Sequence, residues 1–172
     1  MYLNETYKQT KISRLCQLFD LGSPRLTRVH LDIQSSNLDP ICWPRLNHFL
    51  AGSTHLCDMY LNYGYPGDDI IDLTKLFEAA TWPNLLSWTS HGVDADVDAV
   101  ANFIHNHPLL GILECSYPSF DCSLVDEGSF PKLRKAAAQD VHTLQNLTMI
   151  GAPKLMEISC FPCHCVGRYR SL

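Results

Sequence analysis

The residues with the clearest capacity for chemistry stand near the C-terminal end, in the stretch CFPCHC that runs from Cys160 to Cys165. The spelling Cys-x-x-Cys-His attaches c-type haem, and a Cys-x-x-Cys pair alone can form half of a zinc site or a redox pair. A zinc site needs a second ligand pair at a suitable spacing, and a haem needs a second axial ligand. The sequence supplies neither signal, so we expect no cofactor. A metal- or haem-binding protein that uses the whole cluster, Cys160, Cys163, His164 and Cys165, is the alternative interpretation.

A second candidate for chemistry is the stretch DADVDA, which has the alternating carboxylates of a calcium-binding loop. Counting from Asp94, the sixth position is Ala99 where such a loop needs glycine, and the twelfth is His105 where it needs glutamate. We therefore expect these carboxylates to cap a helix over residues 97–105. No serine nucleophile elbow, phosphate-binding loop or His-Glu-x-x-His motif occurs, so the sequence predicts a protein that is not an enzyme.

The composition limits the possible classes of protein. The chain has 172 residues, of which 46% are hydrophobic and 18% charged, as in an ordinary globular domain. A net charge of -5 argues against a nucleic-acid partner, because phosphate backbones require a basic surface. The opening MYLNETYKQTKISRL is too polar for a signal peptide, and no apolar run is long enough to span a membrane. Eight cysteines are too few for a disulfide scaffold, so we expect a cytoplasmic or nuclear protein with free thiols.

One short pattern recurs six times along the chain. It has a proline or threonine, a leucine two residues later, and further positions three and five residues after that leucine that are mostly apolar. The six leucines are Leu26, Leu56, Leu85, Leu110, Leu133 and Leu155, at intervals of 22 to 30 residues. This spacing overlaps the period of leucine-rich repeats, and the pattern matches their L-x-x-L-x-L core.

Most of the six patterns follow a stretch with helical periodicity, apolar at i, i+3 and i+4. These stretches are Leu15, Leu18 and Phe19; Leu46, Phe49 and Leu50; Leu73, Leu76 and Phe77; Val100, Phe103 and Ile104; and, less regularly, Leu144, Leu147 and Thr148. A proline ends each helix, and a short strand with alternate inward residues follows. The sequence thus predicts an α/β leucine-rich-repeat solenoid, right-handed, with a parallel strand layer and a helix layer in about six irregular repeats. We expect this domain to cover residues 1–161, and residues 162–172 to form a frayed tail.

The same alternation predicts which residues form the core. Cys160 takes the last inward position of the sixth strand, as Cys115 does in the fourth, and should be a small buried residue. Ser90 is small for such a position, as are the two alanines of the fifth strand, so the later repeats should pack less well. Trp88 is predicted in the core. The other tryptophans, Trp43 and Trp82, precede prolines and are predicted at helix–strand corners, where they would cover the helix layer.

The stretches WPNLLSW and AVANFIHNHPLLGIL resemble the repeat region of fungal F-box leucine-rich-repeat proteins, and the resemblance extends over about residues 15–161. It implies a curved solenoid that recruits substrates to an SCF-type, cullin-based ubiquitin ligase. No F-box phrase precedes Leu15, so the resemblance implies a ligase adaptor as partner only if an F-box exists outside this chain. An inert truncated fragment is a further alternative.

The outward positions of the predicted strands define a candidate site for an unknown target protein. They line the concave face of such a solenoid and mix charged, aromatic and amide side chains, as protein interfaces do. The predicted site residues are Arg28, His30, Asp58, Tyr60, Asn62, Thr89, His91, Glu114, Lys135 and Glu157. Tyr60 is the favoured anchor, because tyrosine is enriched among residues that dominate binding energy. The sequence thus predicts a non-enzymatic protein–protein interaction module.

Overall fold

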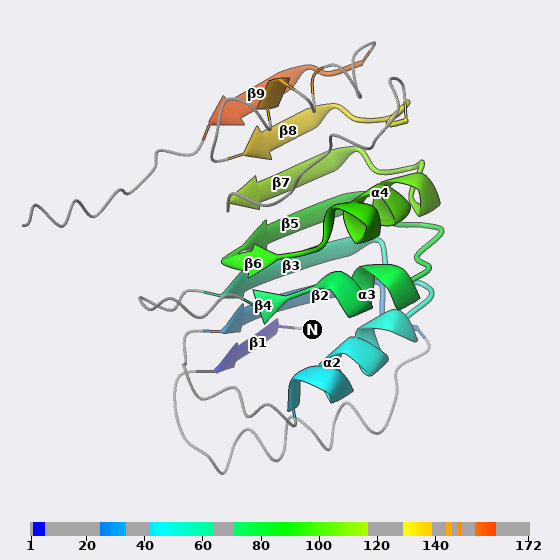
Figure 1. Cartoon of the computed structure of the whole chain (residues 1–172), viewed down its shortest axis with the longest axis vertical. Helices are drawn as coiled ribbons and strands as arrows, with labels where there is room; N and C mark the ends of the chain where they lie inside the picture. The colour runs from blue at the N-terminus through cyan, green and yellow to red at the C-terminus, as the bar shows by residue number, and fades with distance from the viewer. Residues whose placement is uncertain are drawn as a thin grey trace, which may run out of the picture.

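The computed structural model describes residues 2–5, 25–33, 42–63, 71–116, 129–138, 144–145, 148 and 154–160. Within them, seven strands form one parallel sheet in chain order (Figure 1). These strands are β1 (Tyr2–Glu5), β2 (Arg28–Ile33), β3 (Asp58–Tyr63), β5 (Ser87–His91), β7 (Ile112–Ser116), β8 (Lys135–Ala138) and β9 (Glu157–Cys160). The predicted α/β class with a parallel strand layer is confirmed.

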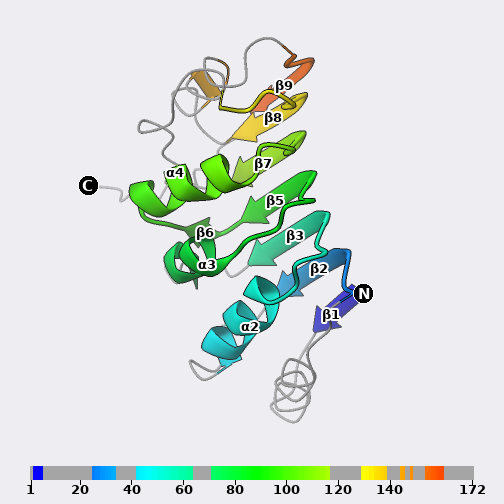
Figure 2. The same cartoon turned by 90° about the vertical axis from the view of Figure 1, so that its right-hand side faces the viewer.

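Within the described segments, three continuous helices and a small second sheet accompany the large sheet. The helices are α2 (Cys42–Ala51), α3 (Thr74–Ala79) and α4 (Val97–Asn106), and the small sheet pairs β4 (Ile71–Asp72) with β6 (Val93–Asp94). Figure 2 shows the three helices as one layer along one side of the large sheet. The predicted stretches of α2 and α4 lie within those helices, and α3 contains Leu76 and Phe77 and begins immediately after Leu73, its N-cap residue, so helices form at all three predicted places. The predicted helix at residues 15–19 and the tail at residues 162–172 lie outside the described residues.

The register of the sheet aligns the predicted inward positions into two rows. One row runs through Val29, Met59, Trp88, Leu113, Ala136 and Ile158. The other runs through Leu31, Leu61, Ser90, Cys115, Ala138 and Cys160. Equivalent residues from segments 22 to 30 residues apart therefore lie side by side. From β2 to β8 these positions are all buried, so five of the six patterns form the core as predicted.

The start of each strand repeats one hydrogen-bond arrangement. The carbonyl oxygen of Thr27 accepts from the N–H groups of Cys57 and Asp58, at 2.8 and 3.1 Å. The same double acceptance recurs at each later step across the sheet, with the carbonyls of Cys57, Leu86, Gly111 and Arg134 as acceptors. Five steps of the same geometry mean that the six strand entries are structurally equivalent, although their sequences differ.

The centre of the core is aromatic. Phe77 of α3 stacks on Phe103 of α4, with ring centroids 4.4 Å apart, and Trp88 of β5 meets both rings at 5.2 Å. Trp82 stacks against Trp88 at 5.8 Å, with an angle of 21° between the ring planes. Stacked and edge-to-face aromatic pairs contribute about 0.5–1.5 kcal/mol beyond the area that they bury. Through these contacts α3 and α4 pack on the middle of the sheet.

A buried residue stands at the same place before several strands, directly ahead of the repeated sequence pattern. Together these residues form a row across the molecule. Each member stands immediately before the proline or threonine of the repeated pattern, and its carbonyl oxygen accepts from the N–H of the leucine three residues later. The four described members are Ser53, Trp82, His107 and Phe130, each 1% exposed or less. The sequence analysis did not predict this row, because its members share a position and not a residue type.

Three of these side chains also satisfy carbonyl groups at helix C-termini, which have no partner within the helix. The Ser53 hydroxyl donates to Phe49 at 2.8 Å, and the Trp82 indole N–H donates to Leu50 at 2.9 Å. His107 Nδ1 bonds the carbonyl of Phe103, and its Nε2 accepts from the backbone N–H of Trp82 at 3.1 Å. Buried hydrogen bonds of Trp82 and His107 therefore connect the C-terminal end of α2 with the C-terminal end of α4.

The prediction for Trp43 was wrong. Trp43 lies in the first turn of α2 and donates its indole N–H to the carbonyl of Asp72 at 3.2 Å, so it joins α2 to the small sheet. Trp82 does lie at the helix–strand corner, but it is fully buried between helices and sheet and does not cover the helix layer. Only the predicted core position of Trp88 is confirmed without change.

The prediction that Cys160 is a buried core residue was also wrong. Cys160 is exposed, and its inward neighbour Ile158 is 53% exposed. In the described part of the chain β9 pairs with β8 alone. A strand buries its inward side chains only where another layer covers them, and the alternation pattern carries no information about that cover.

Candidate functional site

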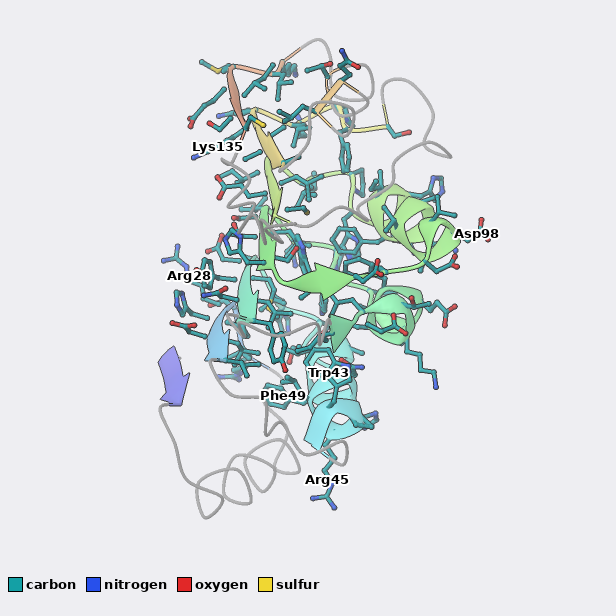
Figure 3. The ribbon with its side chains drawn as sticks, turned by 60° about the vertical axis from the view of Figure 1, so that its left-hand side comes forward. Arg28, Trp43, Arg45, Phe49, Asp98 and Lys135 are labelled. Atoms are coloured by element: carbon teal, nitrogen blue, oxygen red, sulfur yellow. The ribbon has the colours of Figure 1, made fainter. Side chains whose placement is uncertain are left out.

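All ten predicted site residues lie on one side of the large sheet, opposite α2, α3 and α4. We call this side the open face, defined by three rows of register partners. The rows are Arg28, Asp58, Ser87, Ile112, Lys135 and Glu157; His30, Tyr60, Thr89, Glu114, Ala137 and Ser159; and Asp32, Asn62 and His91. Figure 3 shows Arg28 and Lys135 on this side and Asp98 on the far, helical side. The strand alternation therefore brings the predicted residues together.

An aromatic cluster occupies the part of the open face over β2, β3 and β5. The rings of His30 and Tyr60 stack, with centroids 4.1 Å apart and an angle of 9° between their planes. His91 meets Tyr60 edge-on at 5.8 Å. Adjacent parallel strands lie about 4.8 Å apart, which suits ring stacking between register partners. These two contacts hold the Tyr60 ring in a defined orientation.

Ion pairs flank the aromatic cluster. Arg28 Nε lies 2.7 Å from Asp58 Oδ2 at one end of the face. At the other end, Lys135 Nζ lies 3.0 Å from Glu114 and 3.1 Å from Glu157, so one ammonium group serves two carboxylates. Exposed ion pairs of this kind stabilise a fold by about 0–1 kcal/mol each. Their main effect here is to orient charged groups across the face.

The open face carries more negative than positive charge among the described strand residues. The described strand residues of this face include four carboxylates, those of Asp32, Asp58, Glu114 and Glu157, and two cations, Arg28 and Lys135, so their formal charges sum to about -2. Asp32 also accepts a hydrogen bond from Asn62 at 3.1 Å. Such a surface attracts positively charged groups.

Burial and neighbouring carboxylates both shift pKa values on the open face. Burial raises the pKa of the Tyr60 hydroxyl, and the charges of Asp32 and Glu114 raise it further. Burial lowers the pKa of His91, while Glu114 acts in the opposite direction. Hydrogen bonds to Glu114 and Glu157 raise the pKa of Lys135. At neutral pH, therefore, His91 is mainly uncharged and Lys135 stays protonated.

Two further residues contribute to the open face beside the ten predicted site residues. Asp32 follows from the same alternation as His30, and its effect on Tyr60 depends on the lateral register of β2 and β3. Ile112 is an outward apolar residue, 37% exposed, between Ser87 and Lys135 in the first row. The strand alternation predicts both as outward residues, but it carries no signal for the effect of Asp32 on Tyr60.

Two other motifs, the DADVDA carboxylates and the C-terminal cysteine cluster, lie away from the open face or outside the described residues. Asp96 caps α4, because its Oδ1 accepts from the N–H of Asp98 at 2.9 Å, which confirms the capping interpretation. Cys163, His164 and Cys165 lie outside the described residues. Within the part of the chain that the structure describes, no three His, Cys, Asp or Glu side chains gather in a way that could hold a metal ion.

A hollow of about 520 Å³ on the helix side is a feature that the sequence did not predict. Its described lining consists of Trp43, Pro44, Asn47, Tyr63, Ile71, Asp72 and Lys75, from α2, the end of β3, β4 and α3. The lining includes a buried acceptor, Asn47 Oδ1, for which the described residues supply no hydrogen-bond partner. The hollow depends on the position of the two-residue strand β4, which no periodicity in the sequence indicates.

Comparison of the chain with protein-family models, with curated proteins and with solved structures gives no match. None of the helices in the described segments combines the length and the apolar character that crossing a bilayer requires. The function of the open face must therefore be inferred from its own geometry and charge.

Proposed function

We propose that the chain is a right-handed leucine-rich-repeat solenoid and a non-enzymatic protein–protein interaction module. The support is the equivalence of its units: six strands enter one parallel sheet in chain order, through five copies of the same double hydrogen bond. Three of the connections between neighbouring strands carry a helix on the same side of the sheet (Figure 1). A unit of this kind buries its apolar residues only by stacking on neighbouring units. This requirement is the physical basis of a solenoid.

The open face is the proposed binding surface, and one observation carries this proposal. Ten residues predicted from alternation alone share a face that holds stacked aromatic rings, carboxylates and cations in fixed register. Protein interfaces mix such groups over a broad area, whereas small-molecule sites are concave and mostly apolar. The rigid sheet also places these side chains without the ordering cost of a flexible loop.

Selection of binders from a random peptide display library tests the binding surface. We expect peptides that bind the wild-type protein to lose at least about tenfold in affinity for Thr89→Arg and for Ile112→Arg, because each change puts a long cation into the face. Glu78→Arg, on the exposed side of α3, is the matched control and should bind as the wild type does. Selected peptides that bind all four proteins equally would exclude the open face as the binding surface.

We further propose, from the resemblance to F-box leucine-rich-repeat proteins, a relationship to substrate receptors of cullin-type ubiquitin ligases. Docking on the ligase adaptor would require an F-box outside this chain. Co-purification of the chain with adaptor and cullin subunits tests direct docking, and a chain extended by its neighbouring coding sequence tests the F-box requirement. If neither form binds the adaptor, the ligase relationship is wrong, while the interaction module itself still stands or falls by the peptide experiment.

A further inference from the structure

We propose that the open face recognises a basic side chain, arginine in preference to lysine, presented by the target protein above Thr89. This inference rests on the proposed function and specifies the chemistry of the partner. The recognition site consists of Tyr60 on β3, Thr89 on β5 and Glu114 on β7, which are register partners on three successive strands. We call these three residues the Tyr60–Glu114 site.

The first argument is the orientation of the Tyr60 ring. His30 stacks on one side of this ring at 4.1 Å, from β2. Since β2 and β5 lie on opposite sides of β3, the other side of the ring is directed toward β5 and its register partner Thr89. His91, also on β5, holds the Tyr60 ring edge-on at 5.8 Å. A cation above Thr89 would therefore meet a ring whose orientation is set before binding, which suits a cation–π contact.

The three side chains of the Tyr60–Glu114 site differ in length. Thr89 is short and only 9% exposed, whereas Tyr60 and Glu114 on either side are longer. A partner side chain that descends onto Thr89 thus has an aromatic ring on one side and a carboxylate on the other. The planar guanidinium group of arginine is able to stack on the ring and donate to the carboxylate at the same time, while the ammonium of lysine is a point charge.

Charge complementarity also favours a basic side chain. Carboxylates on both sides of Tyr60, those of Asp32 and Glu114, act on its hydroxyl, so negative potential converges on this part of the face. Lys135 is shared between Glu114 and Glu157 and does not neutralise both. An acidic segment or a nucleic-acid phosphate would meet this negative potential at a cost, whereas a basic segment gains from it.

A titration monitored by amide NMR tests the Tyr60–Glu114 site. The probes are two capped peptides, Gly-Ser-Ala-Arg-Ala-Ser-Gly and the same peptide with citrulline, the neutral isostere, in place of arginine. We expect the arginine peptide to bind at least about fivefold more tightly, from one cation–π contact and one ion pair. The largest shifts should fall on the amides of Tyr60, Thr89 and Glu114.

Variants assign the effect to named groups. Tyr60→Leu and Glu114→Gln should each reduce the preference for arginine over citrulline by about threefold or more. Tyr60→Phe keeps the ring and should keep the preference, and Glu78→Gln on α3 removes a carboxylate away from the face and should change nothing. Circular dichroism of each variant verifies that it is folded.

Three outcomes separate this inference from the proposed function. Equal binding of the two peptides, or a preference that survives both Tyr60→Leu and Glu114→Gln, overturns the basic-side-chain site. If display selection has at the same time yielded peptides that bind the open face, the interaction module stands and only its proposed partner chemistry is wrong. If display selection yields no peptide that binds the open face, and neither NMR peptide shifts its amides, both proposals are wrong.

Discussion

His107 is a buried histidine whose two ring nitrogens both have backbone partners. Nε2 accepts from the N–H of Trp82, so the proton of the neutral ring is on Nδ1 and is donated to the carbonyl of Phe103. The rings of Trp82 and Phe103 pack against the imidazole, with centroids 5.6 and 4.6 Å away. Protonation of Nε2 would break the bond to Trp82 and bury a positive charge, so the fold depends on the neutral form.

This arrangement predicts that the protein loses stability as the pH falls below about 6.5. Burial lowers the pKa of His107 in the folded state, whereas in the unfolded chain it titrates near its ordinary value of about 6.5. Below that pH the unfolded state takes up a proton that the folded state does not, so the free energy of unfolding decreases until the folded pKa is reached. Above about pH 6.5 the contribution is fully present.

Urea denaturation between about pH 7.5 and pH 5.5 measures this dependence. In His107→Gln the slope of stability against pH should become shallower, and the remaining slope should include His91, whose pKa is lowered in the same direction. His105→Gln, an exposed histidine on the same helix, is the control and should keep the wild-type slope. An unchanged slope in His107→Gln would show that this residue is not the source of the acid sensitivity.

Gly92 is the second residue on which the fold depends, because no other residue fits its conformation without strain. It has φ of +68°, and a Cβ added there would lie far inside contact distance of the Tyr63 carbonyl oxygen. Gly92→Ala should therefore reduce the free energy of unfolding by about 2 kcal/mol or more. At Gly111 an added Cβ would meet its nearest atoms at 3.6 Å, so Gly111→Ala should have a much smaller effect. Equal losses in the two variants, measured by denaturation, would contradict this explanation.

At the scale of elements, the three helices could be predicted because each carries apolar residues at i, i+3 and i+4. The strands could be predicted because the same pattern of inward residues recurs six times. The two-residue strands β4 and β6 could not, since two residues have no period. Burial of Ile158 and Cys160 was predicted wrongly, because the pattern marks inward positions but not whether a further layer covers them.

The sequence predicts which residues lie on the open face, but it does not predict which of their side chains contact one another. Alternation assigns Tyr60 and His30 to the same side of their strands, whatever the register between those strands. That the two rings stack, or that Lys135 bridges two carboxylates, depends on lateral alignment of segments 22 to 30 residues apart. This alignment follows from packing of the whole sheet, which no single segment encodes.

The start of α4 is an element whose stability depends on one carboxylate. Asp96 Oδ1 accepts from the N–H of Asp98, and the N–H of Asp96 donates to the hydroxyl of Thr74 at 2.8 Å, so the cap also ties α4 to α3. Asp96→Ala should cost about 1 kcal/mol of unfolding free energy, whereas Asp96→Asn retains a capping oxygen and should lose much less. Chemical denaturation of the two variants distinguishes capping from a general effect of charge, since both remove the same negative charge. Similar losses in both would argue against the capping role.

At the scale of the whole molecule, strand order equals chain order, so each strand of the large sheet pairs only with its neighbours in sequence along that sheet. Stability in such an arrangement is a sum of local units and their interfaces, and it need not be uniform. The inward residues Met59, Trp88 and Leu113 of the middle strands are 1% exposed or less, whereas Ile158 of β9 is 53% exposed. The middle of the sheet also packs on the aromatic cluster of α3 and α4.

We therefore expect amide hydrogen exchange to be slowest in β3, β5 and β7, and at least about tenfold faster in β9. Leu113→Ala removes a fully buried side chain and should cost about 2–5 kcal/mol, with accelerated exchange centred on β5, β7 and β8. Ile158→Ala, the matched truncation on β9, should leave protection of β5 almost unchanged, because little of its side chain is buried. Mass-spectrometric exchange on the wild type and both variants measures these effects. Equal protection of β9 and β5, with equal losses from the two truncations, would mean that the sheet opens as one cooperative unit and that its stability is not built from neighbouring interfaces.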